Sequence, residues 1–164
     1  KRLDELAFYF PVVELTVNSI QRALLPLLPE HSPLKTVISR LGFYKLTGFM
    51  KGFIDLVFEH EGRFYIVDYK SNHLGNNEAD YQSEQLDNAM IAHDYPLQYL
   101  IYTLALHRYL KLRLPHYDPE QHLGGAYYLF IRGMKAEWGH AGIFYDKPDL
   151  DVLNAFDRCI QGEE

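Results

Sequence analysis

The pattern of apolar and polar positions between residues 43 and 72 is that of β-strands. Three apolar runs there read FYKLTGFM, GFIDLVFE and RFYIVDYKS, and Gly48, Gly52 and Gly62 punctuate them. Residues 4–13 form an earlier apolar and aromatic run. GGAYYLFIRG, at residues 124–133, is a late run bounded by glycines. The pattern therefore predicts three strands in the middle of the chain, one strand before them and one buried strand after them.

Helical spacing of apolar residues appears in the intervening segments. Residues 15–28 predict a helix that Pro26 and Pro29 limit at its C-terminal end. Residues 81–92 begin a second helical region, and Pro96 suits the first turn of a helix that continues to about residue 112. Residues 149–160 predict a closing helix with Asp149 near its N-cap. Loops are expected at residues 29–42, 73–80 and 114–123, and around Trp138.

This order of elements predicts an α/β fold with a mixed β-sheet flanked by helices. The sheet would combine antiparallel hairpins with one crossover strand. The 164 residues suit a single domain that spans the whole chain, residues 1–164. Hydrophobic residues make up 48% and charged residues 23%, which is an ordinary globular composition. No apolar run approaches the ~18 residues of a membrane span, so no membrane partner is expected.

The formal net charge of −6 bears on function. A free-standing nucleic-acid binder is usually basic, so a nucleic-acid role here must depend on a local site, on metal ions or on delivery by other domains. The basic residues in segments 35–51 and 108–113 are interpreted as solvated surface. Cys159 is the only cysteine, which excludes an internal disulfide and is compatible with a reducing cytoplasm. The chain starts at Lys1 without a methionine, and we expect it to be a piece of a longer protein.

Two aspartates and a lysine interrupt the most hydrophobic part of the chain. Residues 61–62 predict a two-residue hairpin turn, and that register places Asp55 directly opposite Asp68. Directly opposed side chains share a face, with β-carbons roughly 4.5–5.5 Å apart. Because side chains alternate along a strand, Lys70 projects from the same face as Asp68. A longer loop or a one-residue slip would separate the two acids.

Two carboxylates held this close favour either protonation of one of them or a bound cation. An all-oxygen site with room for water suits Mg²⁺ or Mn²⁺. The Lys70 ammonium is then available to orient a water or to stabilise charge developing on a phosphate. Metal, activated water and a cationic clamp are what phosphodiester hydrolysis requires. The simpler interpretation is a surface ion pair between Asp68 and Lys70, with Asp55 on a solvated rim. An acid–base hydrolase of the glycosidase kind is disfavoured by the adjacent lysine.

The elements G-F-I-D at residues 52–55 and D-Y-K at residues 68–70 resemble the PD-(D/E)xK nuclease superfamily. In that superfamily a strand-borne Asp and a D/E-x-K element share a metal site. More narrowly, LTGFMKGFIDLVFEHEGRFYIVDYKSNHLG, DYPLQYLIYTLALHRYL and GGAYYLFIRG resemble the RecB-type nucleases, over roughly residues 3–160. The resemblance implies a restriction-endonuclease-like core and a DNA nuclease.

The resemblance also implies a role for each matching residue. Asp55 and Asp68 would be the metal-binding acids, the backbone carbonyl of Tyr69 would complete that part of the metal shell, and Lys70 would be the catalytic lysine.

A second element of the RecB-type nucleases, QxxxY, matches Gln98 and Tyr102. Residues four apart share one face of a helix. This pair would therefore pack beside the catalytic centre or touch DNA.

RecB-type nucleases usually carry a metal-binding histidine on a helix upstream of these strands. No residue before Asp55 matches that motif, and His31, in the context E-H-S-P, is not assigned the role. We expect that a chain without this histidine binds metal weakly and cuts DNA poorly or not at all. The eight histidines show no metal-binding spacing and are interpreted as surface or loop residues.

The resemblance further implies Mg²⁺, with Mn²⁺ as a substitute. No phosphate-binding glycine motif occurs, so ATP would act only through helicase domains outside this chain. The implied partners are single DNA strands from unwound ends, the subunits RecC and RecD, and the RecA recombinase as a docking partner, all in the cytoplasm. The competing hypothesis is a catalytically inert module that keeps the fold and serves as a docking surface.

Overall fold

The computed structural model describes residues 1–163, which fold around one five-stranded sheet. The strands lie in the spatial order β1-β2-β3-β4-β5. Strands β1–β2, β2–β3 and β4–β5 pair antiparallel, and β3–β4 pair parallel. This confirms the predicted mixed sheet with one crossover. The strand bounds are β1 Arg2–Thr16, β2 Lys45–His60, β3 Arg63–Lys70, β4 Leu123–Phe130 and β5 Ile143–Asp146.

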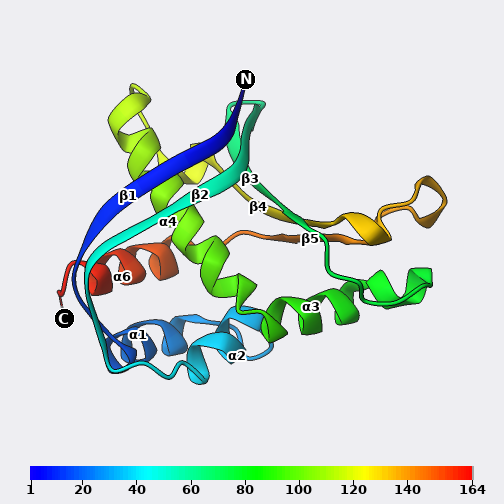
Figure 1. Cartoon of the computed structure of the whole chain (residues 1–164). Helices are drawn as coiled ribbons and strands as arrows, with labels where there is room; N and C mark the ends of the chain where they lie inside the picture. The colour runs from blue at the N-terminus through cyan, green and yellow to red at the C-terminus, as the bar shows by residue number, and fades with distance from the viewer. Residues whose placement is uncertain (164) are drawn as a thin grey trace.

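Helices provide the crossover and cover the core side of the sheet (Figure 1). Helices α3 and α4 lie in the connection between β3 and β4, and α4 passes behind β1 and β2 in that view. Ile54 of β2, Leu104 of α4 and Leu153 of α6 belong to one buried cluster. The helix bounds are α1 Val17–Leu24, α2 Pro33–Ser39, α3 Ser83–Ala92, α4 Tyr95–Arg113, α5 Pro119–His122 and α6 Leu150–Ile160. Short 3₁₀ segments are Leu25–Leu27, Glu78–Tyr81, Ile131–Gly133 and Ala136–Trp138.

The helices predicted at residues 15–28, 81–92, 96–112 and 149–160 are confirmed to within a few residues. Pro96 lies in the first turn of α4, where its missing N–H has no helical partner to lose. Residues 29–42 were predicted as loop, and this was wrong because α2 lies there. Pro33 starts that helix, and Leu34, Val37 and Ile38 bury its apolar side.

The two strands predicted from residues 43–50 and 52–59 are one continuous strand, β2. The glycines inside it do not end it, because β1 pairs with β2 along its length. Gly52 pairs with Phe8, and a β-carbon at residue 52 would lie 2.6 Å from the Phe8 ring. Gly52 therefore makes room for a ring that packs across the strand. Strand β5 was missed because it has only four residues.

No helix among residues 1–163 is both long enough and apolar enough to cross a lipid bilayer.

Candidate active site

The β2–β3 hairpin has the register that the two-residue turn predicts. Glu61 and Gly62 both have positive φ, 49° and 77°, as a type I′ turn requires. The registered pairs continue from the turn to Leu56–Val67. The next position on each strand is an aspartate, Asp55 on β2 and Asp68 on β3. The turn and its register therefore bring the two acids to neighbouring positions on β2 and β3.

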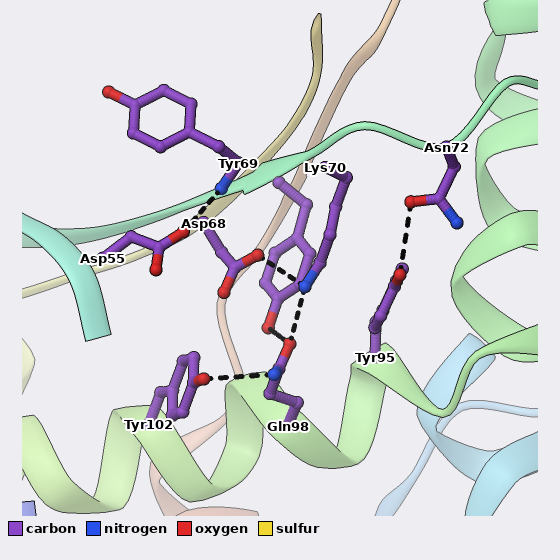
Figure 2. Close-up of polar contacts among 9 residues, drawn as sticks. Asp55, Asp68, Tyr69, Lys70, Asn72, Tyr95, Gln98 and Tyr102 are labelled. Atoms are coloured by element: carbon purple, nitrogen blue, oxygen red, sulfur yellow. Dashed lines mark hydrogen bonds and ion pairs between the residues drawn. The ribbon is translucent and has the colours of Figure 1, made fainter. Parts of the chain in front are cut away.

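The two acids differ in exposure, although the simplest hairpin would place them alike. Asp68 is 3% exposed, whereas Asp55 is exposed. The Asp55 carboxylate turns towards the neighbouring backbone, where its Oδ2 accepts a hydrogen bond of 3.1 Å from the Tyr69 N–H. Figure 2 shows this bond beside Asp68, on the side of β3 that faces α4. Solvent therefore reaches the acid pair from the Asp55 side.

Strand β2 changes which of its side chains point to the core near Asp55, and this explains why Asp55 is exposed. Ile54 and Val57 are both buried, although residues three apart in a regular strand point to opposite faces. Strand β2 must therefore rotate between these positions. Across the ladder, Glu5 of β1 has φ of 53° and lies between the pairs Asp4–Leu56 and Leu6–Ile54, which share one register. Asp55 occupies the position where the strand changes face, so its side chain is not enclosed by the core.

Asp68 has an unusual electrostatic environment. Its Oδ1 lies 2.5 Å from Lys70 Nζ as an ion pair, but no donor is aligned with this buried oxygen as a hydrogen bond among residues 1–163. Burial raises the pKa of the Asp68 carboxyl, the Lys70 ammonium opposes that rise, and the negative charge of Asp55 adds to it. The structure thus holds a carboxylate whose charge is only partly compensated by protein groups.

Lys70 is fixed from several sides. Its Nζ donates a 3.1 Å hydrogen bond to Gln98 Oε1 of α4, in addition to its ion pair with Asp68. The ammonium also lies 4.0 Å from the centroid of the Tyr95 ring and 5.1 Å from that of Tyr128. Both distances are within the range of a cation–π interaction. The amine is therefore held in one place before any ligand arrives.

The polar network continues along α4 (Figure 2). Gln98 Nε2 donates to the Tyr102 hydroxyl at 3.1 Å, and the Tyr128 hydroxyl donates to Gln98 Oε1 at 2.9 Å. Burial, followed by the charges of Asp68 and Asp55, raises the pKa of Tyr102 to about 12. Gln98 and Tyr102 thus share one face of α4, as their spacing on a helix predicts, and Gln98 joins that face to Lys70.

Sequence reasoning missed three residues of this network. The Tyr95 ring lies against the Lys70 ammonium, and the Tyr95 hydroxyl donates a 3.2 Å hydrogen bond to Asn72 Oδ1. Its position three residues before Gln98 was an available signal, because residues three apart share a helix face. Tyr128 lies beside Asp68 across the parallel β3–β4 pair. That partnership depends on strand pairing and has no signal in the sequence around either residue.

The residues present fit a hard dication. Asp55 and Asp68 supply carboxylate oxygens beside each other, and the chemistry of an all-oxygen donor set suits Mg²⁺ or Mn²⁺. No group of three or more His, Cys, Asp or Glu side chains gathers in a metal-binding cluster within the described residues. That is compatible with Mg²⁺, which keeps several waters and needs few protein ligands.

His31, which the sequence analysis left unassigned, lies away from the acid pair. It lines a cavity of about 530 Å³ with Asp87 and Asp146, between other elements. His73, the histidine nearest in sequence to the D-Y-K element, lies with its Nε2 3.1 Å from Asn76 Oδ1.

The sequence matches the family model of the PD-(D/E)XK nuclease superfamily over residues 12–159. It is 44% identical over 158 residues to the RecBCD enzyme subunit RecB of Escherichia coli (strain K12), covering 96% of this chain and 13% of that protein. It is 50% identical over 156 residues to the protein of the same name from Haemophilus influenzae, covering 94% of this chain and 12% of that protein. For the Mycolicibacterium smegmatis protein the identity is 38% over 186 residues, covering 99% and 17%.

The chain thus spans between an eighth and a sixth of the length of these curated relatives. The mixed sheet, its helices and the D-Y-K strand agree with the restriction-endonuclease-like fold expected for the superfamily. The match covers strands β2 to β5, the end of β1 and the whole network around Asp68. This chain belongs to the PD-(D/E)XK nuclease superfamily.

Proposed function

We propose that this chain is a divalent-metal-dependent nuclease domain that hydrolyses phosphodiester bonds in DNA. The observation that carries the proposal is the cluster of Asp68, Lys70 and Gln98 beside the exposed Asp55. A buried acid, a fixed amine and a second acid open to solvent meet at one place. A purely structural ion pair would not need the second carboxylate or the amide that holds the amine.

Each residue has a distinct role in this proposal. Asp55, Asp68 and the backbone carbonyl of Tyr69 would hold Mg²⁺ or Mn²⁺, which supplies Lewis acidity and lowers the pKa of a bound water. Lys70 donates a hydrogen bond to a phosphate oxygen as negative charge develops there. Gln98 keeps the Lys70 ammonium directed towards the acids. Water adds to phosphorus and loses a proton to solvent, the bond to the leaving oxygen breaks, and that oxygen takes up a proton from solvent, which cuts the strand.

The relatives extend the proposal to a larger assembly. Because they are named as RecB subunits of the RecBCD enzyme, we propose that the chain acts within a longer helicase–nuclease that works with RecC and RecD on DNA ends for recombinational repair. Helicase domains of such a protein would use ATP and deliver single strands to the site. That delivery explains how a domain with a net charge of −6 acts on DNA. Docking of RecA would be a separate role of this chain.

The test combines metal binding with strand cutting. Calorimetry should detect Mg²⁺ or Mn²⁺ binding to the wild type and much weaker binding to Asp68→Asn. Cutting of single-stranded DNA by the full-length protein should disappear in Asp68→Asn and in Lys70→Met.

Two control variants match these changes elsewhere in the fold. Asp87→Asn removes another half-buried carboxylate, and Lys135→Met removes an ammonium that lies 3.8 Å from the Trp138 ring centroid. Both controls should cut at the wild-type rate. Cutting that persists in Asp68→Asn and Lys70→Met would refute the site, and a wild type that neither binds metal nor cuts would favour the inert docking module.

A further inference from the structure

Large aromatic side chains are exposed on the sheet face that leads to Asp55. Tyr9, Phe49, Phe53 and Tyr69 are 64%, 63%, 65% and 51% exposed. We call these four residues the aromatic strip. Soluble proteins rarely leave several large rings together in water unless the surface binds something.

The aromatic strip extends over three neighbouring strands, β1, β2 and β3. Tyr9 of β1 and Phe49 of β2 stack on each other, with ring centroids 4.6 Å apart and an interplanar angle of 11°. Phe53 follows on the same face of β2, roughly 13 Å further along the strand than Phe49 at ~3.3 Å per residue. The spacing produces a row of flat apolar surfaces rather than one compact patch.

The row ends at the acids. Asp55 comes two residues after Phe53, and Tyr69 immediately follows Asp68. The Tyr69 backbone N–H also donates a hydrogen bond to the Asp55 carboxylate, so the Tyr69 ring begins at the residue that contacts this acid. Figure 2 shows the Tyr69 ring on the opposite side of β3 from Lys70 and Gln98. A ligand lying on the row would therefore lie on the face of the sheet opposite Lys70 and would meet Asp55, the exposed one of the two acids, at the end of the row.

One cation accompanies the rings. Lys51 lies between Phe49 and Phe53 in β2, on the same face, and is opposite Tyr9 in the ladder. It has no carboxylate partner among residues 1–163, whereas Lys45 at the far end of β2 is paired with Glu14. An ammonium without a carboxylate partner, placed between two exposed rings of one strand, suits a ligand with flat apolar groups and negative charges at regular intervals.

We propose that the aromatic strip stacks the unpaired bases of a single DNA strand, with Lys51 on its phosphates, and directs that strand to Asp55 and Asp68. Only unpaired bases have faces free for stacking, and base–aromatic stacking works with any sequence. Stacking also provides affinity that does not depend on net positive charge, which this chain lacks. The inference deepens the proposed function and rests on it, since it assigns a substrate-binding surface to that site.

The experiment measures binding of the protein that contains this chain to oligo(dT), in EDTA so that no strand is cut. Phe53→Ala should weaken binding by roughly tenfold, as alanine substitution of a stacking ring does. Phe53→Trp should retain affinity, and its added fluorescence should be quenched by oligo(dT). Leu112→Ala, which removes an even more exposed apolar side chain from α4, should bind like the wild type.

An oligonucleotide with abasic positions separates stacking from other effects. It should bind the wild type and Phe53→Ala equally weakly, because neither can stack on a missing base. An equal loss on both oligonucleotides, or no loss in Phe53→Ala, would overturn the proposal. So would an unquenched Phe53→Trp signal, or light scattering that shows the strip joining two copies of the chain.

This readout also separates the two proposals. Binding in EDTA requires no catalysis, so a wild type that binds through the strip but never cuts would refute only the proposed nuclease function. A wild type that cuts with Mg²⁺ while Phe53→Ala cuts with unchanged KM would refute only the stacking surface.

Discussion

Replacing Lys70 with methionine should destabilise the protein because it leaves the Asp68 carboxylate buried without its cation. The Asp68 side chain is 5% exposed and the Lys70 side chain 12% exposed, and Asp68 Oδ1 lies 2.5 Å from Lys70 Nζ. Removing one partner of a buried ion pair costs about 3–5 kcal/mol. We expect a loss of about 3 kcal/mol at neutral pH, since Asp55 leaves one side of the site open to solvent. In urea this corresponds to a midpoint lower by roughly 1–2 M.

The pH dependence of this loss follows from the sign of the pKa shift. The pKa of Asp68 is raised in the folded protein, so protonation favours folding, and this contribution is present below the unfolded pKa of about 3.9. It is lost as the pH rises through the folded pKa. Lys70→Met raises that folded pKa further, because the opposing ammonium is gone. The difference between variant and wild type should therefore be small near pH 4 and reach its full size by pH 8.

The assay is equilibrium unfolding in urea with EDTA, at pH 4 and pH 8. The double variant Lys70→Met/Asp68→Asn should recover most of the stability, because no buried charge remains. Lys35→Met is the control, since Lys35 forms a 2.7 Å ion pair with the exposed Glu30, and it should change the midpoint little. Equal midpoints for Lys70→Met and wild type at pH 8, or an equal loss at both pH values, would refute the reasoning.

Further predictions concern the packing and the network around the lysine. Gly52→Ala should lower stability by about 1–3 kcal/mol in thermal unfolding, because the new β-carbon would meet the Phe8 ring. Adding Phe8→Leu should restore the stability, and a loss that persists in the double variant would contradict the packing explanation. Gln98→Leu should lower kcat for strand cutting with little change in KM, because Lys70 loses the amide that orients it, whereas Gln98→Glu should retain more activity. Tyr128→Phe removes one hydrogen bond to Gln98 but keeps the ring beside Lys70, so stability should fall by only about 1 kcal/mol, and a larger loss would mean that the hydroxyl has another role.

The hairpin could be predicted from the sequence because it depends on residues that are close together in the chain. Glu61-Gly62 is a turn sequence, the apolar runs on both sides match in length, and the register follows once the turn has two residues. The same reasoning located the helices, because apolar spacing and Pro96 act within a few residues of one another. Where the interpretation failed, as for residues 29–42 and the supposed break within β2, the deciding contacts came from distant segments. A glycine inside a strand looks like a break until Phe8 of β1 is known to pack over it.

The sequence by itself determined which residues are candidates for the chemistry: Asp55 and the D-Y-K element on adjoining strands and, through the family resemblance, Gln98 and Tyr102 on one helix face. Short-range periodicity fixes these relations, because side-chain direction repeats every two residues in a strand and about every 3.6 in a helix. Only the tertiary structure decided that Asp68 is enclosed while Asp55 is open, since a rotation of β2 opposite Glu5 turns one acid outward. It also brought Tyr128 beside Asp68 through parallel pairing of strands that lie more than fifty residues apart in the chain. Burial and pairing of this kind depend on long-range packing, which no local pattern encodes.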